Sequence, residues 1–270
     1  MDIIHIESAS NPLIKRIRGM TNRVARRKSG LFLIEGIKVV QEALEKDLDF
    51  ENLVVSKSFF QTDEFQQLLC NACEIHVVED RLFQELSDTQ TPQGVLALVR
   101  TLHTDESDFY DDVCPLVLIL DRIQDPGNLG TIFRTALSFS ASGIYLCRGT
   151  VDPYNPKVIR AASGALFTMP FISGIDLVDA IVNAKENGLK IVALSADTTD
   201  DIASLDLKEP TALILGNEGQ GIEKEARELV DINARIPISA KSESLNVAIA
   251  NAIALYEVAM QRATASKKLS

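Results

Sequence analysis

The sequence predicts an α/β protein in which a larger parallel-sheet domain follows a smaller α/β domain. From residue 31 onward, apolar runs of strand length alternate with helical periods. In the second half these runs are almost continuously apolar, which is typical of parallel strands covered on both faces. Residues 101–114 between the halves are polar, acidic and without periodicity. We therefore expect domains at 1–100 and 115–270, joined by a linker at 101–114.

Composition limits the class of protein. The chain has 270 residues and 46% hydrophobic content, enough for a core in one large domain or two small ones. No apolar stretch approaches the roughly 18 residues that a transmembrane helix needs. The N-terminus opens with an acid and does not look like a secretory signal. Four cysteines do not form a disulfide framework, so a reduced cytoplasmic setting is expected.

The charge is distributed unevenly along the chain. The net charge of −11 argues against a nucleic-acid partner, because phosphate attraction needs basic patches. Residues 1–30 nevertheless hold seven basic residues against Asp2 and Glu7, which is seven minus two, or +5. The seven are Lys15, Arg16, Arg18, Arg23, Arg26, Arg27 and Lys28. A solvated helix face and an RNA-facing segment both fit this cluster.

The elements of the first domain follow from the alternation after residue 30. The predicted strands are 31–36, 51–56, 73–79 and 94–100, and the predicted helices are 37–46, 63–72 and 80–88. In the second domain the predicted strands are 116–120, 143–147, 169–172, 190–194, 212–215 and 233–236. Its predicted helices are 129–140, 156–165, 177–187, 222–229 and 245–262.

Three polar loops follow strands of the second domain, where ligands bind in parallel sheets. The first loop, DRIQDPGNLGTIFRTA, places Asn128 at a helix N-cap position. Gly130 would allow the close approach of backbone or ligand. Arg134 is an isolated cation in an otherwise apolar helix, where it could bind a ligand or simply extend to solvent.

The second loop, LILGNEGQGIEKEA, is rich in glycine. Its glycines, Gly216, Gly219 and Gly221, have the reverse of the dinucleotide-binding order, and no acidic residue follows at the expected distance. Glu218 disfavours a phosphate ligand. This loop is therefore either a tight turn or a site for a ligand with hydroxyls or positive charge.

The third loop precedes a long helix in RIPISAKSESLNVAIANAIALYEVAMQR. Ser242 or Ser244 could be its N-cap. Asn246 in the first turn is a weak helix former, so something other than propensity places it there. The helix is apolar nearly all round, which indicates either a central core helix or a dimer interface.

Together the three loops resemble the three motifs of the SpoU (TrmH-like) family of RNA ribose 2′-O-methyltransferases, in the SPOUT superfamily. The matching stretches occur in the family's order as DPGNLGTIFRTA, LILGNEGQGI and IPISAKSESLNVAIANAIALYE. The first half looks like the family's accessory RNA-binding domain through FLIEGIKVVQEAL and TPQGVLALV. The resemblance implies a parallel-sheet domain with a deep trefoil knot, an exception to the usual rule against knots. It also implies a homodimer.

The resemblance further implies which residues form the site. Gly216, Ile236 and Leu245 would contact S-adenosylmethionine, largely through backbone groups, with Asn217, Glu218 and Gly219 shaping the second loop. The catalytic residues would be Asn128, Arg134, Ser244 and Asn246. Because a guanidinium resists deprotonation, we expect Arg134 to bind the phosphate beside the ribose and to stabilise the developing alkoxide rather than to accept a proton.

The implied activity is S-adenosylmethionine-dependent methylation of a ribose 2′-hydroxyl. The arrangement of the accessory domain, with a basic leader before it, looks more like the family's ribosomal-RNA members than its tRNA members. Two alternatives remain: a tRNA ribose methyltransferase and a non-catalytic RNA-binding protein of the same fold. A dehydrogenase-like enzyme is disfavoured by the glycine spacing, and the pattern of Asn128 and Arg134 favours ribose over a base as acceptor. Cys70 and Cys73 form a C-x-x-C pair without a second pair for zinc.

Overall fold

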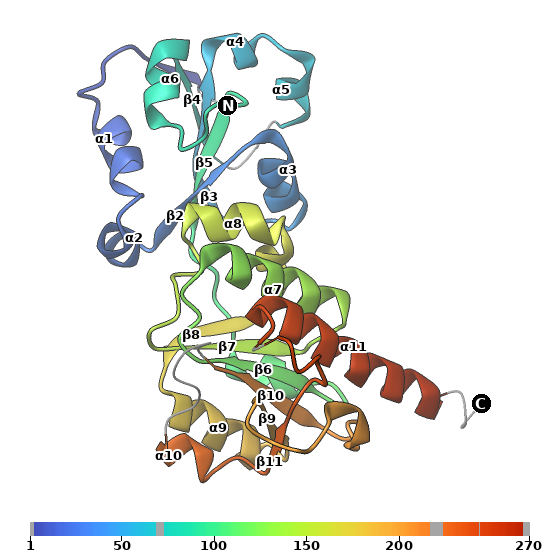
Figure 1. Ribbon diagram of the computed structural model, residues 1–270. Helices are drawn as coiled ribbons and strands as arrows, with labels where there is room; N and C mark the ends of the chain where they lie inside the picture. Colours follow the sequence, from blue (N-terminus) through green and yellow to red (C-terminus); the bar gives the residue numbers. More distant parts are fainter. Residues whose placement is uncertain (1–2, 69–72, 217–223, 243, 267–270) are drawn as a thin grey trace. The chain divides into compact units, whose positions relative to one another are not determined.

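The chain folds into two compact units, shown in a computed structural model (Figure 1). The structure describes residues 3–68, 73–216, 224–242 and 244–266. The first unit comprises Met1–His103 and Tyr154–Phe167, and the second comprises Thr104–Pro153 and Thr168–Ser270. The division predicted from the sequence differs from this one, because the predicted second domain, residues 115–270, includes the segment Tyr154–Phe167.

The first unit is built on a mixed five-stranded sheet with the order β1-β4-β3-β5-β2. Its strands are β1 (Ile3–Ile6), β2 (Leu31–Glu35), β3 (Phe50–Ser56), β4 (Glu74–Val78) and β5 (Val95–Arg100). Strands β1, β4 and β3 are parallel, whereas β5 runs antiparallel to both β3 and β2. The four predicted strands are confirmed, and β1 was not predicted.

Short helices surround this sheet. They are α1 (Pro12–Gly19), α2 (Arg23–Ser29), α3 (Ile37–Glu45), α4 (Lys57–Phe60), α5 (Asp63–Gln67), α6 (Asp80–Leu86) and α8 (Pro156–Ala162), the last followed by a 3₁₀ turn, Ala165–Phe167. The segment that contains α8 packs on β2 through aromatic rings: the Phe32 and Tyr154 centroids lie 4.6 Å apart.

The basic leader forms α1 and α2 rather than a loose tail. Asn11 and Asn22 cap these helices, and Ile14 and Ile17 are buried in the core of the unit. Arg26 is also buried and donates to the carbonyl oxygens of Met20 at 2.6 Å and Thr21 at 3.0 Å. Two further cations form ion pairs within the unit, Arg16 with Glu51 and Arg18 with Glu85. The other four basic residues of the leader are exposed: Lys15, Arg23, Arg27 and Lys28.

The second unit is built on a six-stranded sheet with the order β11-β9-β10-β6-β7-β8. All five strand pairs are parallel, which confirms the prediction. The strands are β6 (Leu116–Leu120), β7 (Gly143–Cys147), β8 (Phe171–Ile175), β9 (Lys190–Leu194), β10 (Thr211–Leu215) and β11 (Ile232–Ala234). The unit's helices are α7 (Pro126–Ser138), α9 (Leu177–Glu186), α10 (Lys224–Arg227) and α11 (Val247–Ser266), with 3₁₀ turns at Glu106–Tyr110 and Ile202–Ser204.

Helices cover both faces of this sheet, as its continuously apolar strands require. On one face, α9 and α10 pack against alternate strand residues such as Val117, Ile119 and Ile214. On the other face, α7 and α11 lie side by side (Figure 1). The described part of the chain contains no helix that could cross a membrane.

The segment predicted as a linker packs against the second unit over much of its length. Phe109, in the 3₁₀ turn Glu106–Tyr110, is fully buried, and its ring centroid lies 4.9 Å from that of Tyr145. A Cβ at position 143 would clash with the Phe109 ring, so Gly143 provides the space for it. The acidic composition of this segment therefore gave no indication that Phe109 is buried in the second unit.

Candidate functional site

The polar loops of the second unit meet at one edge of its sheet, because the carboxyl ends of parallel strands share an edge. Asp121 follows β6, Gly216 follows β10, and Ile236 lies two residues beyond β11. The Asp121 N–H donates to the carbonyl oxygen of Leu215 at 2.9 Å, so the first loop starts beside the second.

The first loop begins its helix earlier than the sequence predicted. Asp125 is the N-cap of α7: its Oδ1 accepts from the Asn128 N–H at 2.8 Å, and Pro126 occupies the first turn. The expectation that Asn128 sits at the N-cap was therefore wrong. The Asp-Pro pair is itself a helix-start pattern and could have identified the true cap. Because Asp125 serves as the cap, the Asn128 side chain is available for other contacts.

The third loop places Asn246, not Ser242 or Ser244, at the start of α11. Oδ1 of Asn246 accepts from the N–H groups of Ala248 at 3.0 Å and Ile249 at 3.3 Å. Neither serine is the cap, because the helix begins at Val247 and both serines precede the capping position. This capping role explains why a weak helix former stands here.

Asn128 and Asn246 join the first and third motifs directly. Nδ2 of Asn246 donates to Oδ1 of Asn128 at 2.9 Å, across 118 positions of sequence. Each amide is thereby fixed in orientation. Two of the four predicted catalytic residues thus form one rigid polar pair at the edge of the sheet.

Helices α7 and α11 continue side by side from this pair. Asn251 is fully buried and donates from Nδ2 to Oγ1 of Thr135 at 2.9 Å. Further along, the rings of Phe139 and Tyr256 have centroids 6.3 Å apart. Because the contacts advance along both helices in the same direction, α7 and α11 run parallel, and the polar pair is anchored by a packed helix–helix interface.

Arg134 lies apart from the asparagine pair. It is exposed on α7, six residues after Asn128, which corresponds to a rise of about 9 Å along the helix and a different helix face. Within the described part of the chain its guanidinium has no hydrogen-bond or ion-pair partner. Ser244 is exposed too, and its carbonyl oxygen accepts from Oγ of Ser242 at 3.2 Å. No hydrogen bond joins Arg134 or Ser244 to Asn128 among the described residues.

The predicted cofactor residues are partly described. Gly216, Ile236 and Leu245 are half-buried at the edge where β10 and β11 end and α11 begins. Two aliphatic side chains with backbone polar groups nearby suit a purine ring and its amino group, so these residues fit an adenosine-containing cofactor. Asn217, Glu218 and Gly219 lie outside the described residues.

A second polar cluster at this edge was not predicted. Arg122 has a positive φ of 56°, and its Nη2 lies 2.8 Å from Oδ2 of buried Asp121. A Cβ at Gly149 would lie 2.8 Å from Cγ of Arg122, so only glycine leaves room for this arrangement. Burial, reinforced by Asp121, raises the pKa of the neighbouring Cys147 thiol to about 12. Cys147 therefore stays protonated and is no nucleophile.

The family models identify the class: an α/β methyltransferase with a separate substrate-binding domain. Residues 115–256 match the SpoU rRNA Methylase family, and residues 11–97 match the MRM3-like substrate binding domain. The chain belongs to the SpoU rRNA methylase family.

Similar proteins cover almost the whole chain. The 23S rRNA (guanosine(2553)-2'-O)-methyltransferase RlmP of Bacillus subtilis is 32% identical over 94% of this chain and 98% of its own. An AdoMet-bound rRNA methyltransferase from Sinorhizobium meliloti superposes with a TM-score of 0.85 at 30% identity, covering 95% of this chain and 97% of that one. AviRb from Streptomyces viridochromogenes in complex with AdoMet has a TM-score of 0.86 at 27% identity, with coverage of 94% and 99%.

Proposed function

We propose that the protein transfers a methyl group from S-adenosylmethionine to a ribose 2′-hydroxyl of ribosomal RNA. The observation that carries this proposal is the hydrogen bond between Asn128 and Asn246, which joins a residue of the first motif to a residue of the third. The RNA-modifying names of the relatives and their AdoMet complexes support the same activity.

The reaction is an in-line displacement, in which the ribose oxygen attacks the methyl carbon and the sulfonium sulfur departs with the bonding electrons. Positioning supplies much of the acceleration, because it makes a bimolecular step nearly unimolecular. The asparagine pair offers fixed amide groups for orienting the ribose. Gly216, Ile236 and Leu245 would hold the cofactor, which supplies the methyl group.

Charge at the attacking oxygen must be stabilised as its proton leaves. The three histidines, His5, His76 and His103, all belong to the first unit, so the second unit contains no imidazole base. Arg134 is an exposed cation on the helix that carries Asn128. Its proposed role is to bind the phosphate next to the target ribose and to stabilise the developing alkoxide.

The natural acceptor can be established by mapping. Ribose methylation should be compared in ribosomal RNA and tRNA from cells with and without the gene, and the purified protein with S-adenosylmethionine should restore the missing mark. Loss of one mark in ribosomal RNA supports the proposal. Loss confined to tRNA would favour the tRNA enzyme, and unchanged marks with no transfer in vitro would favour a non-catalytic RNA-binding protein.

The proposed assembly is a homodimer in which α11 meets a second copy of the chain. Its exposed apolar residues recur at spacings of four, three and four, which forms one stripe along the helix: Ile249, Ile253, Tyr256 and Met260. A stripe of this kind, exposed in one chain, is suited to a protein interface. The trefoil knot and the cytoplasmic location stay predictions of the family resemblance and of the cysteine content.

A further inference from the structure

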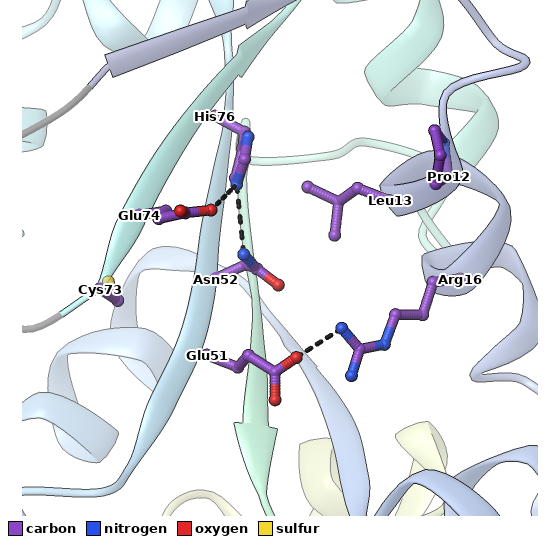
Figure 2. Close-up of a pocket in the computed structure, with 8 residues that line it drawn as sticks. All are labelled: Pro12, Leu13, Arg16, Glu51, Asn52, Cys73, Glu74 and His76. Carbon is purple, nitrogen blue, oxygen red and sulfur yellow. Dashed lines mark hydrogen bonds and ion pairs between the residues drawn. The ribbon is translucent and has the colours of Figure 1, made fainter.

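A pocket in the first unit contains a cluster of polar side chains that the proposed chemistry does not use (Figure 2). Its volume is about 540 Å³, within the range of small-ligand sites. It is bounded by α1 on one side and by the first residues of β3 and β4 on the other. Its lining residues are Pro12, Leu13, Arg16, Glu51, Asn52, Cys73, Glu74 and His76.

His76 and Asn52 form the buried wall of this pocket. Nδ2 of Asn52 lies within hydrogen-bond distance of Nε2 of His76, at 3.2 Å. Nδ1 is buried without a hydrogen-bond partner in the described part of the chain. The Asn52 amide is thereby fixed, and its oxygen points to the side of the pocket where Leu13 and Arg16 lie (Figure 2).

Two carboxylates, those of Glu51 and Glu74, line the pocket. Glu51 accepts from both Arg16 and Arg100, so its carboxylate is largely used. Glu74 has a 62% exposed side chain, and Oε2 lies 3.4 Å from Nε2 of His76, a long contact that leaves most of its acceptor capacity available. With Arg100 counted, two carboxylates face two guanidinium groups and His76 is neutral, so the pocket has no excess positive charge to attract a phosphate.

The same pocket has surfaces for a flat ring. Pro12 and Leu13 form an apolar wall, and the Arg16 guanidinium is held by Glu51 as a planar surface. Proteins that recognise RNA sequence stack unpaired, flat bases on guanidinium planes and bind the base edges through hydrogen bonds. No three His, Cys, Asp or Glu side chains among the described residues are placed to hold a metal ion.

Helix α1 connects the pocket to a group of exposed cations. It contributes Pro12, Leu13 and Arg16 to the pocket and also carries exposed Lys15. The exposed cations of α2, Arg23 and Arg27 among them, follow directly in the chain. Cations beside a pocket lined by carboxylates match a nucleotide whose phosphate stays outside while its base enters.

We propose that this pocket binds one unpaired base of the RNA substrate, and that it prefers a base with an exocyclic amino group to uracil. Glu74 and the Asn52 oxygen accept hydrogen bonds from the amino group and the adjacent ring N–H where one is present, as a carboxylate does for the cytosine N4 amine. Leu13 and Arg16 contact the ring. The inference rests on the proposed function only in taking RNA as the ligand.

The test uses the full chain and fluorescent hexauridylate, alone or with a single central cytosine, adenine or guanine. Anisotropy titrations should show about tenfold tighter binding of the amino-bearing probes. Glu74→Leu should reduce their affinity to that of hexauridylate while leaving hexauridylate binding unchanged. The matched control is Glu79→Leu, which removes a comparably exposed carboxylate, 51% exposed, just beyond β4 and should keep the preference.

Three results would overturn the proposal: no preference in the wild-type protein, an unchanged preference in Glu74→Leu, or an equal loss for all four probes. Alkylation of Cys73 provides a measurement that does not depend on a variant. Peptide mapping after N-ethylmaleimide treatment should show that the cytosine probe slows modification of Cys73 more than hexauridylate does. Equal rates with both probes count against the pocket.

Failure of this inference is distinguishable from failure of the proposed function. Methyl transfer to ribosomal RNA without any base preference would leave the enzyme assignment intact and remove the pocket. Base preference lost in Glu74→Leu, in a protein that transfers no methyl group to any RNA, would leave the pocket intact and remove the enzyme assignment.

Discussion

One asparagine both starts a helix and binds a second asparagine: Asn246 caps α11 through Oδ1 and donates through Nδ2 to Oδ1 of Asn128. The two interactions use different atoms of one amide, so they can be separated by substitution. Structural and catalytic contributions at this position are therefore open to independent measurement.

Asn246→Asp should separate the two interactions. Aspartate caps helices about as well as asparagine, so the free energy of unfolding should change by less than about 1 kcal/mol. The donor to Asn128 is removed, and a carboxylate then faces an amide oxygen, so methyl transfer should fall at least tenfold.

Asn246→Ala should lose activity and also about 1 kcal/mol of stability. Denaturant unfolding and transfer of a labelled methyl group measure the two effects, and full activity in Asn246→Asp would contradict the assigned hydrogen bond.

Arg134→Ala should abolish turnover and leave S-adenosylmethionine binding nearly intact, because the guanidinium acts on the RNA and not on the cofactor. Single-turnover methyl transfer and calorimetric cofactor titration give the two values. Lys208→Ala is the matched control, since it removes a cation that is 49% exposed in the same unit and should change neither value. An equal loss of turnover and cofactor affinity would make Arg134 a structural residue.

Apolar patterning predicted the parallel sheet well. Strands β6, β7 and β9 match their predicted bounds because each is an apolar run between polar loops. Strand β1 was missed because its apolar run, Ile3–Ile6, is only four residues long and is interrupted by His5. Helices α1 and α2 were hidden by their cations, although Asn-Pro at position 11–12 is a helix-start pattern.

The site was only partly predictable from the sequence. The family resemblance singled out Asn128 and Asn246, but their hydrogen bond spans 118 positions and depends on how α7 packs against α11. Arg122 needs a positive φ, which sequence patterns rarely indicate for a non-glycine residue. Arg134 is exposed, and its guanidinium has no hydrogen-bond or ion-pair partner among the described residues, so the packing of this chain does not fix its position.

Stability should decrease on acidification through His76. Burial lowers the pKa of His76 below its ordinary value of 6.5, so the unfolded chain binds a proton at a higher pH than the folded chain does. The contribution of His76 is therefore fully present above about pH 6.5 and is lost as pH falls below it. Unfolding free energies between pH 7.5 and 5.5 should decline more steeply for the wild type than for His76→Gln. Parallel declines would show that His76 is not buried as a neutral group.

The α11 stripe should determine the oligomeric state. Ile253→Lys places a charge in the stripe, where burying it against a second copy is costly, so sedimentation should show a shift from dimer to monomer. Val178→Lys on α9 is the matched control, because Ile253 and Val178 are both 37% exposed. The control should remain dimeric. A monomeric wild type, or a dimer that tolerates Ile253→Lys, would contradict the proposed interface.

The basic leader should bind RNA phosphates through its exposed cations. Deleting residues 1–30 would be a poor test, because Ile14, Ile17 and Met20 belong to the core of the first unit. Replacing Lys15, Arg23, Arg27 and Lys28 with glutamine removes four exposed charges and preserves that core. RNA affinity should fall at low salt. The slope of log affinity against log salt should become shallower by about 0.7 to 0.9 for each phosphate that the variant no longer neutralises.

The matched control is Arg18→Gln, whose charge is paired with Glu85, and it should leave the slope nearly unchanged. An unchanged slope in the fourfold variant would show that the cluster is a solvated helix surface.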